Sequence, residues 1–113
     1  MPDDCIFCKI AAKQIPVEVI WEDSEFLAFR DLTPQAPIHA LVIPKAHFAT
    51  ILDMDDEGLM GRTLKAVQQT AKALNLTEEG FRTVINCREN GGQTVYHLHI
   101  HLLGGRFMQW PPG

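Results

Sequence analysis

The sequence has no long apolar run and no surplus of basic residues. No stretch approaches about 18 consecutive apolar residues, so no membrane-spanning helix is predicted. The 10 Lys and Arg residues are outnumbered by 14 Asp and Glu, which gives a formal net charge of −4. Because counterion-release binding requires a basic face, polymeric nucleic acid is not an expected partner. No signal-peptide pattern follows the acidic start at Asp3 and Asp4, and the expected location is the cytoplasm.

Repeats, linkers and low-complexity segments are also missing. The 113 residues therefore predict a single domain, 1–113. Apolar residues make up 46% and charged residues 21% of the chain, which is ordinary for a soluble globular protein and excludes intrinsic disorder. A monomer of this size buries little more than about 60% of its unfolded surface, so a partner subunit would add stability.

The hydrophobic pattern predicts an α+β fold with a mainly antiparallel sheet of about five strands. Apolar residues recur at helical spacing over residues 55–75, which predicts one long amphipathic helix. A short helix is expected near the N-terminus, between residues 6 and 15, before Pro16. Strands are predicted where β-branched or alternating apolar residues cluster. These strands are 17–21, 25–30, 39–43, 81–87 and 94–103.

Three of the five histidines stand in the heptapeptide His97-Leu98-His99-Ile100-His101-Leu102-Leu103. Because a strand has a period of two, its histidines are predicted to share one face, and its even-numbered apolar residues to face the core. Neighbouring imidazoles would lie about 6–7 Å apart and the outer two about 13 Å apart. Two of them could share a small ligand or a metal ion, but all three could not converge on one metal.

Two chemistries fit such a row of imidazoles. In one, the histidines hold a catalytic zinc ion that lowers the pKa of a bound water to about 7. In the other, a neutral imidazole is itself the nucleophile, and its neighbours hold a phosphate and transfer protons. A nucleotide-binding module without turnover is a third reading, because a fold does not fix a function. The histidines alone do not decide among these hypotheses.

The segment before the histidine row offers hydrogen-bond donors. Gly91 and Gly92 supply backbone N–H groups, and Gln93 and Thr94 add an amide and a hydroxyl, all suited to phosphate oxygens. Asn86, at the end of the preceding predicted strand, could add another donor. An ordinary hairpin turn would explain the glycines and Asn86 equally well.

The chain has three cysteines, too few for a disulfide scaffold. Cys5 and Cys8 form a C-x-x-C pair, which is either half of a metal site or two core thiols. With His47 and one histidine of the row, they would complete a closed, structural Cys2His2 zinc site. If His97 is the fourth ligand, the other two histidines of the row stay free. A solvated turn residue is the alternative for His47.

The heptapeptide resembles the signature of the histidine triad (HIT) family, in which three histidines alternate with apolar residues. The resemblance is strongest to the branch of histidine triad nucleotide-binding (Hint) proteins and covers nearly the whole chain. The other segments that carry it are Ile6-Phe7-Cys8-Lys9-Ile10, Asp31-Leu32-Thr33-Pro34-Gln35-Ala36-Pro37, Leu41-Val42-Ile43-Pro44-Lys45, Gly91-Gly92-Gln93-Thr94-Val95-Tyr96-His97, and the tail from Gly104 to Gly113.

The resemblance implies a HIT-like fold and a purine nucleoside phosphoramidase, which cleaves the P–N bond of adenosine 5′-phosphoramidates such as AMP-NH2 and AMP–lysine. It implies that His99 is the nucleophile and forms a nucleotidyl-histidine, flanked by His101 and His39, with Thr94 near the leaving group. Asp31 would hold the ribose hydroxyls. The remaining nucleotide contacts that it implies are Asn86, Gln93, Phe7, Ile10, Phe29, Leu32, Ile43 and Trp110.

The resemblance further implies a homodimer in which Trp110 approaches the partner's active site, and no cofactor for catalysis. Thr94 departs from the Ser of many Hint proteins. In bacterial-type members a structural Zn²⁺ joins the C-x-x-C pair to the positions of His47 and His97. We also expect His101 or His39 to be protonated near neutral pH, so that AMP binding weakens above pH ~7 as imidazole charge is lost.

Overall fold

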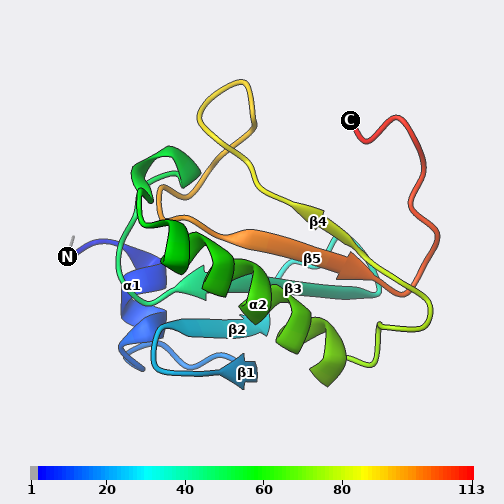
Figure 1. Ribbon diagram of the computed structural model, residues 1–113, viewed down its shortest axis with the longest axis horizontal. Coiled ribbons are helices and arrows are strands. Elements are labelled where there is room, and N and C mark those ends of the chain that lie inside the picture. The colour runs from blue at the N-terminus through cyan, green and yellow to red at the C-terminus, as the bar shows by residue number, and fades with distance from the viewer. Residues whose placement is uncertain (1–2) are drawn as a thin grey trace.

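The computed structural model describes residues 3–113 and contains one five-stranded antiparallel sheet with the strand order β1-β2-β3-β5-β4 (Figure 1). This confirms the predicted α+β fold class. Within the described part, no helix is both long enough and apolar enough to cross a membrane. The elements are α1 (Ile6–Ala11), β1 (Val19–Glu22), β2 (Phe26–Arg30), β3 (Ile38–Pro44), the 3-10 turn Ile51–Asp53, α2 (Glu57–Ala73), β4 (Arg82–Val84) and β5 (Ile100–Gly104).

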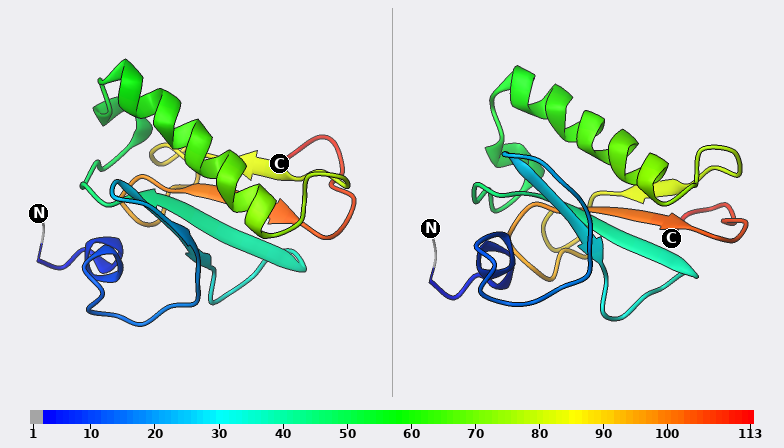
Figure 2. Two further views of the ribbon diagram at one scale, coloured as in Figure 1. Left: turned by 60° about the horizontal axis from the view of Figure 1, so that its bottom comes forward. Right: turned by 90° about the horizontal axis from the view of Figure 1, so that it is seen from below.

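The two helices lie on opposite faces of the sheet (Figure 2). Because successive strand residues alternate in direction, even-numbered residues of β2, β3 and β5 pack with α2. Odd-numbered residues of β2 and β3 form a second apolar cluster with Phe7 and Ile10 of α1. Burying a side chain as completely as Phe26 or Leu102 is worth about 1.5–3 kcal/mol. The α2 face provides most of the core, because its cluster has ten buried side chains and the cluster on the other face has six. We call the opposite side of the sheet the α1 face.

Helix α2 lies within the predicted 55–75. It begins after Asp56, whose carboxylate accepts a hydrogen bond from the Leu59 N–H at 3.1 Å, as expected of an N-cap. It ends before Asn75, which has the left-handed φ of 58°. Its apolar stripe is completed by Thr70, which is fully buried because its hydroxyl donates to the Ala66 carbonyl at 2.8 Å.

The histidine segment is less regular than the predicted strand 94–103, because β5 begins only at Ile100. The pairing with β3 reaches Val42, opposite Ile100, and does not continue. Upstream, the Leu98 N–H donates instead to the Phe48 carbonyl at 2.6 Å. The predicted separation of faces nevertheless holds, since Leu98 and Ile100 are each only 1% exposed on the core side.

Candidate active site

His99 lies on the α1 face and presents one ring nitrogen for chemistry. Its Nδ1 lies 2.7 Å from the carbonyl oxygen of His97. A carbonyl can only accept, so His99 Nδ1 carries the proton and, in the neutral ring, Nε2 carries the lone pair. The ring of Phe7 stands edge-on at 5.1 Å between centroids and fixes the imidazole laterally. This is the tautomer that a nucleophilic imidazole requires.

A short relay of hydrogen bonds orients the two neighbouring histidines. The backbone N–H of Gln35 donates to Nδ1 of His39 at 3.0 Å, so neutral His39 carries its proton on Nε2. That Nε2 donates to Nδ1 of His101 at 2.9 Å, which leaves Nε2–H of His101 as a free donor. The His99 and His101 ring centroids are 5.0 Å apart. A group that touches both imidazoles would therefore meet one lone pair and one N–H.

Both flanking histidines are neutral near pH 7 in the free protein. Burial lowers the pKa of His101 to about 4, assisted by His99 and His39 and opposed by Asp31. Burial also lowers the pKa of His39, again against the opposing charge of Asp31. The expectation that one of them is protonated near neutral pH was therefore wrong for the ligand-free state, because the cost of desolvating an imidazolium outweighs the nearby carboxylate.

A cavity of about 230 Å³ opens beside His99 and His101. Its lining combines apolar side chains of α1 and β2 with the polar side chains of Asp31 and Thr94. The predicted nucleotide contacts that line it are Phe7, Ile10, Phe29, Leu32, Asp31, Thr94, His99 and His101. Ile43 does not line it. That side chain is completely buried beneath the cavity in the apolar cluster of the α1 face.

The Asp31 carboxylate is held in a fixed position at the cavity. Its Oδ1 accepts from the backbone N–H of Thr33 at 2.8 Å and from the Thr33 hydroxyl at 3.1 Å. Its Oδ2 lies 3.5 Å from Nε2 of His39. The carboxylate keeps acceptor capacity for a diol, because an ionised carboxylate has about four acceptor positions.

Two predicted phosphate donors are used inside the protein instead. The Gln93 amide is buried, donates to the carbonyls of Ala49 (2.7 Å) and Val95 (3.1 Å), and accepts from the Arg88 N–H at 2.9 Å. Direct binding of phosphate by Gln93 does not fit this arrangement, because both amide hydrogens are already engaged. Asn86 is also outside the cavity.

The Gly-rich turn shows what Asn86 does. Its amide donates to the Gly91 carbonyl at 2.6 Å and closes the turn. This is the turn role that the sequence left open as an alternative. Gly91 itself is required sterically, since a Cβ there would lie 2.4 Å from the backbone oxygen of Cys87.

Trp110 does not reach the cavity of its own chain. Its ring is 79% exposed and stacks under the guanidinium of Arg82, with 5.8 Å from Cζ to the ring centroid. Arg82 also donates to the Gln109 carbonyl at 2.9 Å, which fixes the tail against β4. Any contact of Trp110 with a nucleotide therefore requires a second chain, as the resemblance implies.

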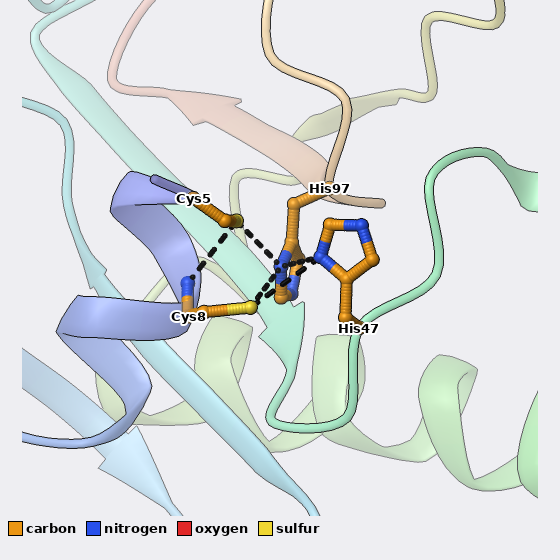
Figure 3. A group of neighbouring side chains, drawn as sticks. All are labelled: Cys5, Cys8, His47 and His97. Carbon is orange, nitrogen blue, oxygen red and sulfur yellow. Dashed lines mark hydrogen bonds between the residues drawn. The ribbon is translucent and has the colours of Figure 1, made fainter. Parts of the chain in front are cut away.

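Four further side chains converge beside the active site, as Figure 3 shows. The ligand atoms of Cys5, Cys8, His47 and His97 all lie within 4.8 Å of one another. Nδ1 of His97 is 3.3 Å from Cys5 Sγ, 3.5 Å from Cys8 Sγ and 3.1 Å from Nδ1 of His47. Cys8 Sγ is 3.4 Å from Nδ1 of His47.

These separations fit a tetrahedral metal site. Zinc with Zn–N of about 2.0 Å and Zn–S of about 2.3 Å gives edges of about 3.3–3.8 Å. His97 Nε2 donates to the Pro44 carbonyl at 2.8 Å, so the Nδ1 lone pair points at the centre of the group, the usual arrangement of a metal-binding imidazole. Burial and the adjacent Cys5 raise the pKa of the Cys8 thiol to about 11. A divalent cation would reverse that preference by stabilising the thiolate.

The chain is also similar to known proteins in sequence and in fold. The HIT domain family model matches residues 12–108. The chain belongs to the HIT family. It is 53% identical over its whole length to an uncharacterized HIT-like protein of Synechococcus elongatus, which it also covers completely. It is 48% identical to protein HitA of Neisseria gonorrhoeae, over 90% of this chain and 96% of that one. The crystal structure of a HIT family hydrolase from Legionella pneumophila superposes with a TM-score of 0.92 at 53% identity, over 97% of this chain and all of that chain.

Some groups of this HIT site were not identified from the sequence. The carbonyls of His97 and Pro44 orient two imidazoles, and the Gln35 N–H orients a third. Backbone groups carry no side-chain signal, so no motif could identify them. Leu41 also lines the cavity, and its position in β3 opposite His101 follows from strand register once the pairing is known.

Proposed function

We propose that this protein hydrolyses the P–N bond of adenosine 5′-phosphoramidates through a covalent nucleotidyl-histidine at His99. The observation that carries the proposal is the forced tautomer of His99. Its Nδ1–H is held by the His97 carbonyl, so an Nε2 lone pair is available at a cavity that also contains a fixed carboxylate. A substrate with a purine, a ribose and a phosphoryl group fits this order of apolar wall, Asp31 and imidazoles.

In the binding step, the base lies against the apolar wall of Phe7, Ile10, Phe29 and Leu32, and the ribose diol donates to Asp31. The phosphoryl group lies between His99 and His101. An anion there favours the imidazolium of His101 and raises its pKa from about 4, so a proton is taken up with the substrate. The imidazolium carries a hydrogen on each ring nitrogen, so His39 must change tautomer and accept from Nδ1–H of His101 instead of donating to it. Nε2–H of His101 is then the acidic N–H at the cavity.

In the first chemical step, Nε2 of His99 attacks phosphorus, the Nε2–P bond forms, and the P–N bond breaks. His101 gives its proton to the departing amine, with the Thr94 hydroxyl beside the leaving group. In the second step, water attacks phosphorus, the P–Nε2 bond breaks, and the water proton returns to His101. AMP and an amine are released and both imidazoles regain their starting states.

We further propose that Cys5, Cys8, His47 and His97 hold a structural Zn²⁺. The closed set of two sulfur and two nitrogen donors supports this assignment, because it leaves no open position for a substrate. The ion would have a structural role, because it would cross-link the start of the chain to the histidine segment. No step of the hydrolysis involves it.

A homodimer in the cytoplasm is also part of the proposal. Large apolar side chains stand exposed on the outer side of α2 and in the tail, including Leu64 (64% exposed), Phe107 (86%) and Trp110 (79%). A second copy of the chain would cover them and would bring Trp110 to the other cavity, in keeping with the family resemblance. Sedimentation equilibrium of the wild type against Leu64→Glu tests the dimer.

The decisive experiment measures AMP release from adenosine 5′-phosphoramidate by metal-stripped protein whose folding is verified by circular dichroism. Sustained release is expected, together with an acid-labile, alkali-stable nucleotidyl adduct on His99 in quenched single turnovers. A specific alternative exists, because the ligand atoms of Asp31, His39 and His101 also lie within 4.8 Å of one another. Loss of turnover that zinc restores, in a protein that stayed folded, would favour a zinc-dependent hydrolase.

A nucleotide-binding module is the remaining alternative. It predicts AMP binding without release of AMP from the phosphoramidate under either metal condition.

A further inference from the structure

Helix α1 contributes residues to two sites at once. Cys8 and the preceding N-cap residue Cys5 belong to the Cys/His cluster, whereas Phe7 and Ile10 form part of the cavity wall beside His99. The helix is only six residues long. Isolated helices shorter than about 12–15 residues are marginal in water, so the position of α1 depends on what anchors it to the sheet.

The anchors of α1 are few. Among the hydrogen bonds of the described residues, those that connect Cys5–Ala11 to other elements run from the two sulfur atoms to His47 and His97. The remaining attachment is apolar, through Phe7 and Ile10 on the cluster of the α1 face. The polar contacts of α1 with the other elements therefore pass through the Cys/His cluster.

His97 makes a second connection between the two sites. Its Nδ1 belongs to the cluster, its Nε2 is fixed by Pro44, and its carbonyl holds Nδ1–H of His99 at 2.7 Å. Phe7 stands edge-on to both rings, with centroids 5.9 Å from His97 and 5.1 Å from His99. A displacement of the cluster is thus transmitted both to the cavity wall and to the ring that we propose as nucleophile.

We infer that the Cys/His cluster and the nucleotide cavity are thermodynamically coupled through α1 and His97, so that Zn²⁺ binding strengthens AMP binding and AMP binding strengthens Zn²⁺ binding. Without a cation, the Nδ1 atoms of His47 and His97 face each other at 3.1 Å, and the polar attachment of α1 consists of weak sulfur contacts. A cation would replace these weak hydrogen bonds with coordinate bonds from all four side chains and so make the cluster rigid. The inference rests on the proposed function for the identity of the ligand, AMP.

Reciprocity makes the coupling measurable from either site. If zinc changes the dissociation constant of AMP by some factor, AMP must change that of zinc by the same factor. We expect a factor of about 5 or more, the lower end of typical coupling between two sites. AMP affinity is measured by calorimetry on zinc-loaded and metal-stripped protein. Zinc affinity is measured by competition with a chromophoric chelator, without and with saturating AMP. Equal zinc affinities under the two conditions would overturn the inference.

Matched variants separate coupling from general damage. Phe7→Leu keeps all four ligands but removes the ring between the sites, so zinc affinity without AMP stays near that of the wild type while the coupling factor falls toward 1. Cys87→Ser removes a thiol that lies outside the cluster and leaves both zinc affinity and coupling unchanged. A full coupling factor in Phe7→Leu would exclude this ring as the route.

A third readout covers the case in which stripped protein unfolds. Protein loaded with Co²⁺ in place of zinc reports the geometry of the cluster through its visible absorption. Addition of AMP is expected to shift this spectrum in the wild type and less in Phe7→Leu. An unchanged spectrum on saturation with AMP would contradict the coupling. If loaded protein fails to bind AMP at all, the proposed function itself is wrong, whereas binding without linkage contradicts only this inference.

Discussion

The carbonyl oxygen of His97 accepts a hydrogen bond from Nδ1 of His99 at 2.7 Å, two residues along the same segment. The contact is possible because the segment has not yet joined the β3–β5 ladder, which begins at Ile100. A regular strand would direct that carbonyl toward a neighbouring strand. The interruption of the strand thus determines which ring nitrogen of His99 is free.

His99→Ala is expected to abolish turnover while AMP still binds. Removal of a nucleophile lowers kcat by on the order of 10⁴-fold or more, whereas the base and ribose contacts remain. Calorimetry with AMP and a phosphoramidate release assay measure the two effects. Tyr96→Phe, at a half-exposed side chain of the same segment, serves as the control and should retain activity. Near-normal turnover in His99→Ala would exclude His99 as the nucleophile.

AMP binding is expected to take up a proton at His101. In the protein without ligand, the His101 side chain has a pKa of about 4, and a bound phosphate raises this pKa. Affinity therefore increases as pH falls from the bound-state pKa toward 4, and is independent of this group above the bound-state pKa. Calorimetry in buffers of different ionisation enthalpy counts the protons. His101→Asn removes this dependence while the titration of AMP itself remains, so identical pH profiles of the two proteins would contradict the prediction.

Gly91→Ala is expected to destabilise the fold by about 1–3 kcal/mol, because its new Cβ would overlap the backbone of Cys87. Gly61→Ala provides the opposite case. A Cβ at Gly61, in α2, meets nothing within 4 Å, and alanine is the better helix former by about 1 kcal/mol. Urea unfolding should move the midpoint down for the first variant and up for the second. A midpoint of Gly91→Ala equal to that of the wild type would mean that the turn relaxes around the added methyl group.

Gln93→Ala is expected to cost about 1–3 kcal/mol of stability, since it removes a buried amide that bonds the backbone of the half-buried Ala49 and Val95 and of the exposed Arg88. The variant has no direct phosphate contact to lose. At temperatures where it stays folded, its KM for phosphoramidate should stay within a few-fold of the wild type. A large rise in KM with unchanged thermal stability would restore the phosphate role implied by the family resemblance.

The parts of the site that sequence predicts best are those set by period-two alternation. The heptapeptide alternation correctly places Leu98 and Ile100 in the core and the imidazoles opposite them. The structure also brings the C-x-x-C pair of Cys5 and Cys8 together with His47 and His97, the grouping that the family resemblance implied. The alternation depends on local geometry, which a short stretch of chain specifies, whereas the Cys/His grouping joins distant segments and could be anticipated only from the resemblance.

The parts that sequence does not predict depend on distant backbone groups. The Gln93 amide donates to the Ala49 carbonyl, which is 44 residues away in the sequence. The Leu98 N–H donates to the Phe48 carbonyl. Only the folded chain brings these groups together. The charge of His101 was likewise misjudged because it depends on burial, and burial is a property of the assembled structure.

Because core and site residues alternate in β5, its pairing register with β3 decides which of them face the core. A slip by one residue against β3 would turn Leu102 outward and drive His101 into the apolar layer under α2. The mispaired chain would lose core packing and bury an unsatisfied imidazole in the same event. In this strand, the pairing register that buries the apolar side chains is therefore also the register that places the histidine at the reactive centre.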